Sequence, residues 1–92
     1  MTPLRVHVWI HGEVQGVFFR ASTQRQARAA GVTGWVRNCF DGSVEAVFEG
    51  DTDAVHELVR WCHHGPANAV VTDVDLEIEP YTGTVPGFNV AG

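Results

Sequence analysis

Arg20 is the residue of this sequence whose position most clearly suggests chemistry. It stands where the loop "GEVQGVFF" gives way to a run of helix-forming residues. A positive charge at a helix N-terminus is unfavourable unless an anion neutralises it, because the helix dipole is already positive there. The free amides of a first helical turn also bind phosphate, and an arginine fork matches phosphate oxygens two at a time. The loop and Arg20 together therefore predict an anion site.

Gly16 strengthens this prediction, because glycine lets a backbone curl closely around an anion. The pattern is neither a P-loop nor a dinucleotide fingerprint. It lacks both the Gly-Lys-Ser/Thr sequence and the G-x-G-x-x-G spacing. The loop alone is therefore a signal of moderate strength, and the elements around it decide what else reaches the site.

Seven elements are expected to position these residues. Apolar and polar residues alternate in runs typical of half-buried strands, and in two other segments apolar residues recur at helical spacing. In chain order we expect strand 4–12, helix 19–30, strand 32–38, strand 43–50, helix 51–66, strand 69–80 and an optional short strand 88–90. The order βαββαβ is the split β-α-β pattern, an α+β sandwich with a four-stranded antiparallel sheet and both helices on one face. We predict one domain, residues 1–92.

The apolar faces of these elements define the expected core. The first strand should direct Arg5, His7, Trp9 and His11 to its other, polar face. The residues expected to face the core are Leu4, Val6, Val8, Ile10, Phe19, Thr23, Ala27, Ala30, Val55, Leu58, Val59, Cys62, Val70, Thr72, Val74, Leu76 and Ile78.

The same topology predicts what lies near the anion site. In a split β-α-β sheet the first two strands run parallel, with the third strand between them. Their ends therefore share one edge. That edge would hold the loop, Arg20, and Asn38 at the close of "GWVRN".

Composition limits the functions that this chain can have. The net charge is −5, with six arginines against eleven acidic residues, and this argues against nucleic-acid binding, which needs a basic footprint. No stretch resembles a membrane span or an export signal. We therefore expect a cytoplasmic monomer in which Cys39 and Cys62 are free thiols.

Two motifs at fixed spacing, "GEVQGVFFR" and "GWVRNCFDGSVEAVFEG", make the chain resemble the acylphosphatases over nearly its whole length. The resemblance implies a ferredoxin-like fold and hydrolysis of the carboxyl–phosphate anhydride of small acyl phosphates, with no metal and no cofactor. It implies that Asn38 holds the attacking water. It also implies that the phosphate is bound by Arg20 together with the loop residues Glu13, Val14, Gln15, Gly16, Val17, Phe18 and Phe19. Cys39 departs from the threonine common in vertebrate members, and Glu13 places an acid in an anion-binding loop.

So small a set of residues is sufficient for this reaction. The leaving carboxylate is the base of an acid with a pKa near ~4, so no general acid is needed. Phosphoryl transfer through a loose transition state needs mainly positioning and charge stabilisation. Arg20 and the loop amides would stabilise the charge, and the Asn38 amide would orient water in line with the scissile bond.

Two other functions compete with this one. A split β-α-β domain can bind RNA through an aromatic sheet face, here His7, Trp9 and His11, although the acidic charge balance weighs against it. The chain could also be a stand-alone relative of the carbamoyl-phosphate-handling domain of hydrogenase-maturation carbamoyltransferases, which resembles the acylphosphatases. A metal site at Cys62, His63 and His64 is not expected, because adjacent helical residues do not face one another.

Overall fold

The computed structural model describes residues 2–91, so the predicted domain limits, residues 1 and 92, lie outside the described residues. The elements follow the predicted order, and the optional terminal strand is present. They are β1 (Pro3–Glu13), α1 (Phe19–Ala30), β2 (Thr33–Asn38), β3 (Val44–Asp51), α2 (Thr52–Cys62), β4 (Val70–Glu79) and β5 (Phe88–Val90). No helix within residues 2–91 is both long enough and apolar enough to cross a bilayer.

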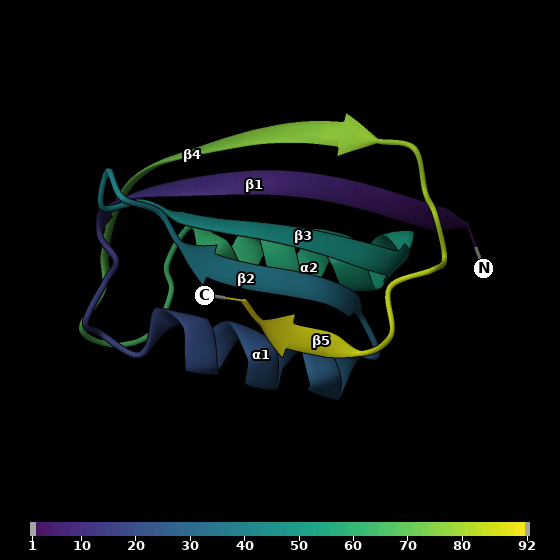
Figure 1. Ribbon diagram of the computed structural model, residues 1–92, viewed down its shortest axis with the longest axis horizontal. Coiled ribbons are helices and arrows are strands. Elements are labelled where there is room, and N and C mark those ends of the chain that lie inside the picture. Colours follow the sequence, from purple (N-terminus) through teal and green to yellow (C-terminus); the bar gives the residue numbers. More distant parts are fainter. Residues whose placement is uncertain (1, 92) are drawn as a thin grey trace.

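The five strands form one sheet in the order β4-β1-β3-β2-β5. The first four are antiparallel neighbours, as predicted, and β5 adds to β2 in parallel, so the sheet is mixed. Both helices cover the same face (Figure 1), with α1 over β2 and β5 and α2 over β1 and β3. The layered arrangement expected from the element order is confirmed.

The core between sheet and helices matches most of the predicted faces. Val6, Val8 and Ile10 of β1 are buried. Both helices bury three residues each on the expected stripes, namely Phe19, Thr23, Ala27, Val55, Leu58 and Cys62. The prediction for Ala30 is wrong, because it is exposed. The helix ends there: Gly31, in the left-handed conformation, donates its N–H to the carbonyls of Ala27 and Arg28 and turns the chain away.

The predicted faces of β4 are wrong at its start. A β-bulge shifts the register between His11 and Gly12, so that His11 pairs with Asp73 but Gly12 pairs with Val71. Thr72 is the extra residue of the bulge. Residues before it therefore face the opposite side of the sheet from the one that strict alternation predicts. Val71 therefore packs against the core, and the predicted Val70 is exposed. Gly12, at φ 124°, allows this close approach, since a Cβ there would collide with the backbone of Val70.

The rest of β4 lies on the predicted face but is poorly covered. Leu76 and Ile78 pair with Val8 and Val6 of β1, yet they are 49% and 72% exposed. The reason is lateral position: α2 packs over β1 and β3, and β4 is an edge strand beyond it. The alternation of apolar residues predicted the side of the sheet on which Leu76 and Ile78 lie, but it did not predict that they would be exposed.

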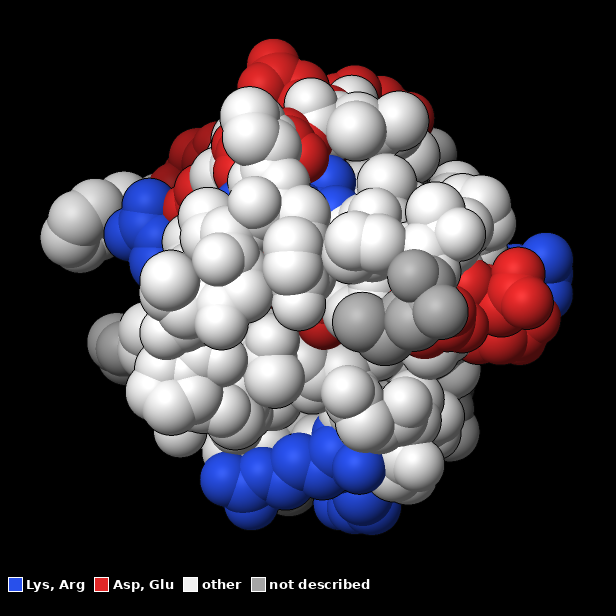
Figure 2. All heavy atoms as spheres, turned by 90° about the vertical axis from the view of Figure 1, so that its right-hand side faces the viewer, with Lys and Arg blue, Asp and Glu red and all other residues white. Residues whose placement is uncertain are grey.

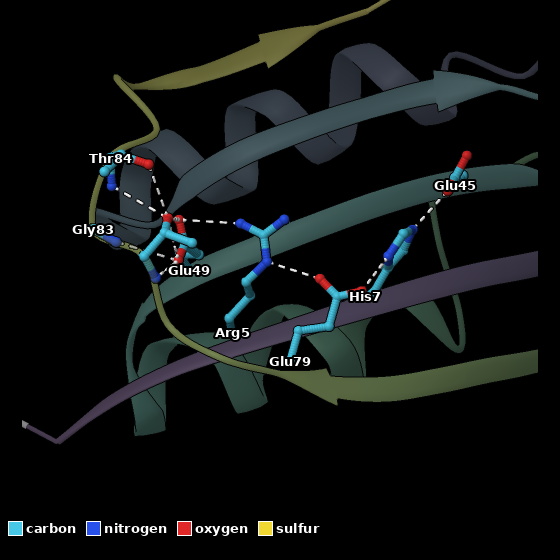
Figure 3. Close-up of polar contacts among 8 residues, drawn as sticks. Arg5, His7, Glu45, Glu49, Glu79, Gly83 and Thr84 are labelled. Carbon is cyan, nitrogen blue, oxygen red and sulfur yellow. Dashed lines mark hydrogen bonds and ion pairs between the residues drawn. The ribbon is translucent and has the colours of Figure 1, made fainter.

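The polar face of β1 is occupied by a row of charge pairs (Figure 3). Arg5 donates from Nε to Glu79 at 2.8 Å, and its Nη1 lies 3.4 Å from Glu49. The ring nitrogens of His7 lie 2.8 Å from Glu79 and 2.6 Å from Glu45. Hydrogen bonds from Arg5, and then from His7, lower the pKa of Glu79. This row ties β4 to β3 across β1.

The other residues of this face are likewise engaged by their neighbours. Trp9 stacks on His7 with ring centroids 4.0 Å apart, and His11 Nε2 lies 3.1 Å from Asp75. Burial alone would raise the pKa of Glu45, but hydrogen bonds from His7 and Arg37 outweigh it and hold the pKa below its usual value. The polar side chains of this face therefore pair with one another, which weakens the hypothesis that the face binds RNA.

Glu49 fastens the segment between β4 and β5 to the sheet. Its fully buried carboxylate accepts hydrogen bonds from the Thr82 amide at 2.6 Å, the Thr82 hydroxyl at 2.9 Å and the Gly83 amide at 3.4 Å. Figure 3 shows Glu49 between Gly83 and Arg5. Burial would raise its pKa, but these bonds and Arg5 outweigh burial and lower it. The carboxylate is therefore held ionised and satisfied.

We expect Glu49→Ala to lower the free energy of unfolding by about 2–3 kcal/mol, because it leaves Arg5 and two backbone amides without their buried acceptor. For a domain of this size that corresponds to a fall in Tm of roughly 10–15 °C. Thermal unfolding followed by circular dichroism measures it. Glu57→Ala is the matched control, since Glu57 forms an exposed ion pair with Arg60, and it should change stability by under ~0.5 kcal/mol.

The Glu49 effect should also depend on pH. A carboxylate with a lowered folded-state pKa stabilises fully above its unfolded pKa, near ~4.3, and loses that contribution as the pH falls through the folded value. The Tm gap between wild type and Glu49→Ala should therefore be widest at neutral pH and narrow below about pH 4. A gap that stays constant down to pH ~2 would show that the carboxylate charge contributes nothing.

Candidate active site

The N-terminus of α1 is open toward solvent. Its N-cap residue Phe18 makes no side-chain capping bond, and the first turn holds no acidic residue. The first helical bond runs from the Ser22 amide to the Phe18 carbonyl, 3.0 Å, so the amides ahead of it in the turn lack helical acceptors. Gly16 at φ 75° and Phe18 at φ 63° are both left-handed and curl the loop around this end.

Arg20 and Asn38 meet at this end of the molecule. They line one hollow of about 380 Å³ together with Val14, Gly16 and Phe18 of the loop and Phe19, the first residue of α1. The sheet explains how residues from different elements converge: Ile10 of β1 and Asn38 of β2 both pair with Val44 of β3, from opposite sides. The shared edge predicted from the topology is confirmed.

Asn38 stands at the junction of two hollows. The second, of about 470 Å³, is lined by Asn38 with Gln15, Arg37, Cys39 and Phe40. Among the residues that the structure describes, Asn38 Oδ1 is the buried side-chain oxygen or nitrogen without a hydrogen-bond partner. Buried polar groups without a partner are rare in native proteins, so this oxygen is a candidate for a functional role.

Comparison with known proteins identifies the family of this chain. The acylphosphatase family model matches residues 6–90. An acylphosphatase from Rubrobacter xylanophilus is 59% identical over 86 residues, which are 94% of this chain and 78% of that protein. The chain belongs to the acylphosphatase family. A solved acylphosphatase from Coxiella burnetii, 37% identical, superposes with a TM-score of 0.92 over 97% of this chain and 93% of its own.

Larger solved proteins with low sequence identity share the fold alone. A solved full-length HypF superposes with a TM-score of 0.84, but it is 19% identical and this chain covers 12% of its length. The ferredoxin-like fold expected from the sequence is thus confirmed by solved structures, and the family by the sequence relatives.

Not every residue of the predicted phosphate loop lines the hollow around Arg20. Glu13 is the last residue of β1, pairs with Val70, and is not among the residues that line the hollow around Arg20. Val17 is half-buried against the core. Glu13, the acidic residue that the motif places in the anion-binding loop, therefore belongs to β1.

Gln15 has a role that the motif alone does not show. Its side-chain Nε2 donates to the Cys39 carbonyl at 2.7 Å and to the Ser43 carbonyl at 2.9 Å. Both acceptors lie in the turn that follows Asn38. Gln15 therefore braces the loop that precedes Arg20 against the β2–β3 turn that follows Asn38.

We expect Gln15→Leu to lower kcat about tenfold while changing inhibition by inorganic phosphate less than twofold. Loss of the brace displaces Asn38 relative to the loop, and small misplacements of a reacting group have large effects on rate. Steady-state kinetics with phosphate as competitive inhibitor measure both. Gln26→Leu, on the exposed side of α1, is the matched control. Equal loss of phosphate binding and kcat would instead place the Gln15 side chain in the anion site.

Three residues lining the hollow were missed by the sequence reasoning: Ala21, Gln24 and Val90. Ala21 and Gln24 follow Arg20 within α1, so helical periodicity could have indicated them. Val90 could not be found in this way. It reaches the site because β5 pairs in parallel with β2, where Val90 lies opposite Val36.

Both cysteines are free thiols, as predicted. Cys62 is buried on α2, and burial raises the pKa of its thiol. The Cys39 Sγ lies 3.7 Å from Glu45 Oε1. Cys39 thus contributes its backbone carbonyl to the Gln15 brace, while its side chain points to the charge row of the sheet.

Charge is spread unevenly over the surface. Viewed from the end opposite the loop, arginine side chains gather at the bottom, on the side of α1, and Asp and Glu side chains lie mainly at the top and on one flank (Figure 2). α1 carries three arginines, whereas β4 carries four carboxylates. Although the net charge is −5, the helix that begins at the anion site lies on the positive side, which favours the approach of a small anion.

Proposed function

We propose that this protein hydrolyses acyl phosphates to a carboxylate and inorganic phosphate. Arg20 and the amides of residues 14–19 bind the phosphate, and the Asn38 amide orients the attacking water. The observation that carries the proposal is that Arg20, from α1, and Asn38, from β2, line one hollow at the uncapped N-terminus of α1. Membership of the acylphosphatase family supports it.

The chemistry needs no further protein group. The carboxylate leaves without protonation, because its conjugate acid has a pKa near ~4. Charge on the phosphoryl oxygens of a loose transition state is stabilised by the guanidinium and by backbone dipoles. The proton of the attacking water passes to a phosphate oxygen of the substrate, since Asn38 is not basic at neutral pH.

We expect activity to survive removal of divalent metals. Arg20 and the loop amides supply the positive charge that a metal would otherwise provide. Hydrolysis of benzoyl phosphate should proceed at an unchanged rate in EDTA, with p-nitrophenyl phosphate, an ester with a poorer leaving group, as the slow comparison substrate. Loss of activity in EDTA with recovery on adding Mg²⁺ or Zn²⁺ would refute the metal-free mechanism.

The protein is further proposed to act as a cytoplasmic monomer on small-molecule substrates, without binding nucleic acid. The net charge of −5 and the pairing among the polar side chains of the sheet face support the absence of nucleic-acid binding. Filter binding of RNA at low salt tests the alternative of a nucleic-acid-binding module. Retention of RNA with no hydrolysis of acyl phosphates would favour that alternative.

A further inference from the structure

Glu45 lies on β3 beside the end of β2 that carries Asn38. It pairs with Arg37, the residue before Asn38. Side chains alternate between the two faces along a strand. Val36 is buried in the core on the face that the helices cover, so Asn38 points to that face as well. Arg37 and Glu45 lie on the opposite, open face of the sheet.

The Glu45 carboxylate contacts both chain neighbours of Asn38. Its Oε1 accepts a hydrogen bond from Arg37 Nε at 2.6 Å, and the Cys39 Sγ lies 3.7 Å from the same oxygen. Its Oε2 lies 2.6 Å from His7 Nε2, which holds the carboxylate from the side of β1 (Figure 3). Glu45 is only 7% exposed. One buried carboxylate thus holds the residues on either side of Asn38.

The direction of the Asn38 amide depends on such support. Within residues 2–91, its Oδ1 has no hydrogen-bond partner, so that atom does not fix the side chain. Asn38 is also the last residue of β2, at the start of a turn. When the residues before and after it are both held on the open face, the chain cannot rotate between them. The Asn38 side chain then keeps its direction toward the other face.

We propose that Glu45 is a positioning residue for the hydrolysis, which keeps the Asn38 amide directed at the attacking water by holding Arg37 and Cys39. The inference rests on the proposed function. It also gives the Cys39 thiol a role, as the second contact that Glu45 makes around Asn38. Because Glu45 does not line the hollow around Arg20, its loss should affect turnover and not phosphate binding.

Glu45→Gln and Glu79→Gln are a matched pair of variants. Each replaces one of the two carboxylates that contact His7 with an amide of similar size, but Glu79 is on β4, two strands further from Asn38. We expect Glu45→Gln to lower kcat for benzoyl phosphate about tenfold and to change inhibition by inorganic phosphate less than about twofold, whereas Glu79→Gln should stay within about twofold of the wild type in both. Thermal unfolding sets an assay temperature at which every variant is folded.

Nuclear magnetic resonance tests the position of Asn38 independently of catalysis. The side-chain amide resonances of Asn38 in a ¹⁵N–¹H correlation spectrum are assigned by their absence from that of Asn38→Ala. They should shift or broaden in Glu45→Gln and remain in place in Glu79→Gln. Arg37→Ala removes the same contact from its half-exposed end. It should shift these resonances and lower kcat about threefold, and it decides the question if Glu45→Gln does not fold.

Three outcomes would overturn this role of Glu45 and leave the proposed hydrolysis intact. The first is wild-type kcat with unmoved Asn38 resonances in folded Glu45→Gln, or in Arg37→Ala if Glu45→Gln does not fold. The second is an equal loss of kcat in Glu79→Gln, which would indicate a general effect of the charge row. The third is a parallel loss of kcat and phosphate inhibition, which would place the effect at the anion site. Failure of the wild type to hydrolyse benzoyl phosphate would instead overturn the proposed function itself.

Discussion

Arg20→Ala is expected to lower kcat/KM by about a thousandfold or more, and to abolish inhibition by inorganic phosphate. Arg20 would contact the phosphate both in the bound substrate and in the transition state, so binding and turnover fall together. Arginines that stabilise transferring phosphoryl groups have effects of this size. Arg20→Lys should remain close to the alanine variant, because a point charge does not reproduce a two-pronged contact. Steady-state kinetics with phosphate as competitive inhibitor measure both changes.

Arg25→Ala and Arg28→Ala are the matched controls for Arg20. Both residues are exposed on the same helix and away from the hollow. They remove the same charge from α1, so they report the contribution of long-range electrostatics alone, which should be about twofold and sensitive to salt. If either control matched the loss at Arg20, general charge rather than a phosphate contact would explain the effect.

Asn38→Ala is expected to separate binding from catalysis. In the proposed mechanism Asn38 contacts the water and not the phosphate, so inhibition by phosphate should change less than about threefold. Loss of an oriented nucleophile should raise the barrier by about 3–4 kcal/mol, which lowers kcat by two to three orders of magnitude. The fold should survive, because the side chain is half-buried at a strand end and its Oδ1 has no protein partner to lose.

Asn68→Ala, in the exposed turn before β4, is the control for removing an asparagine. Thermal unfolding of the Asn38→Ala variant should match the wild type or exceed it slightly, since an unsatisfied buried acceptor disappears. A well-folded Asn38→Ala enzyme with near-normal kcat would remove Asn38 from the mechanism.

The convergence of Arg20 and Asn38 could be predicted from sequence because it depends on local patterns and on topology. Alternation in β1 and helical spacing in α1 are local signals, and the βαββαβ order places β3 between β1 and β2. Once that order is known, the loop after β1 and the last residue of β2 must lie at the same end of the sheet. The motifs identified the family in the same way, through residues close together in the chain.

The errors arose where the outcome depends on partners distant in sequence. Nothing in the β4 segment itself indicates that Thr72 is skipped, because the bulge forms against Gly12 of another strand. The burial of Leu76 and Ile78 depends on whether a helix reaches the sheet edge, which alternation does not encode. Val90 and the bracing side chain of Gln15 belong to the same class, since each acts through a contact with a remote segment.

In the proposed mechanism, water attacks phosphorus within the hollow formed by Arg20 and Asn38. Hydrolysis of benzoyl phosphate in ¹⁸O-labelled water, with the products examined by mass spectrometry after a single turnover, tests it most directly. Attack at phosphorus places the label in inorganic phosphate and leaves benzoate unlabelled, which is the result that we predict. Label in benzoate would mean attack at the carbonyl carbon, and would contradict the roles proposed for both residues.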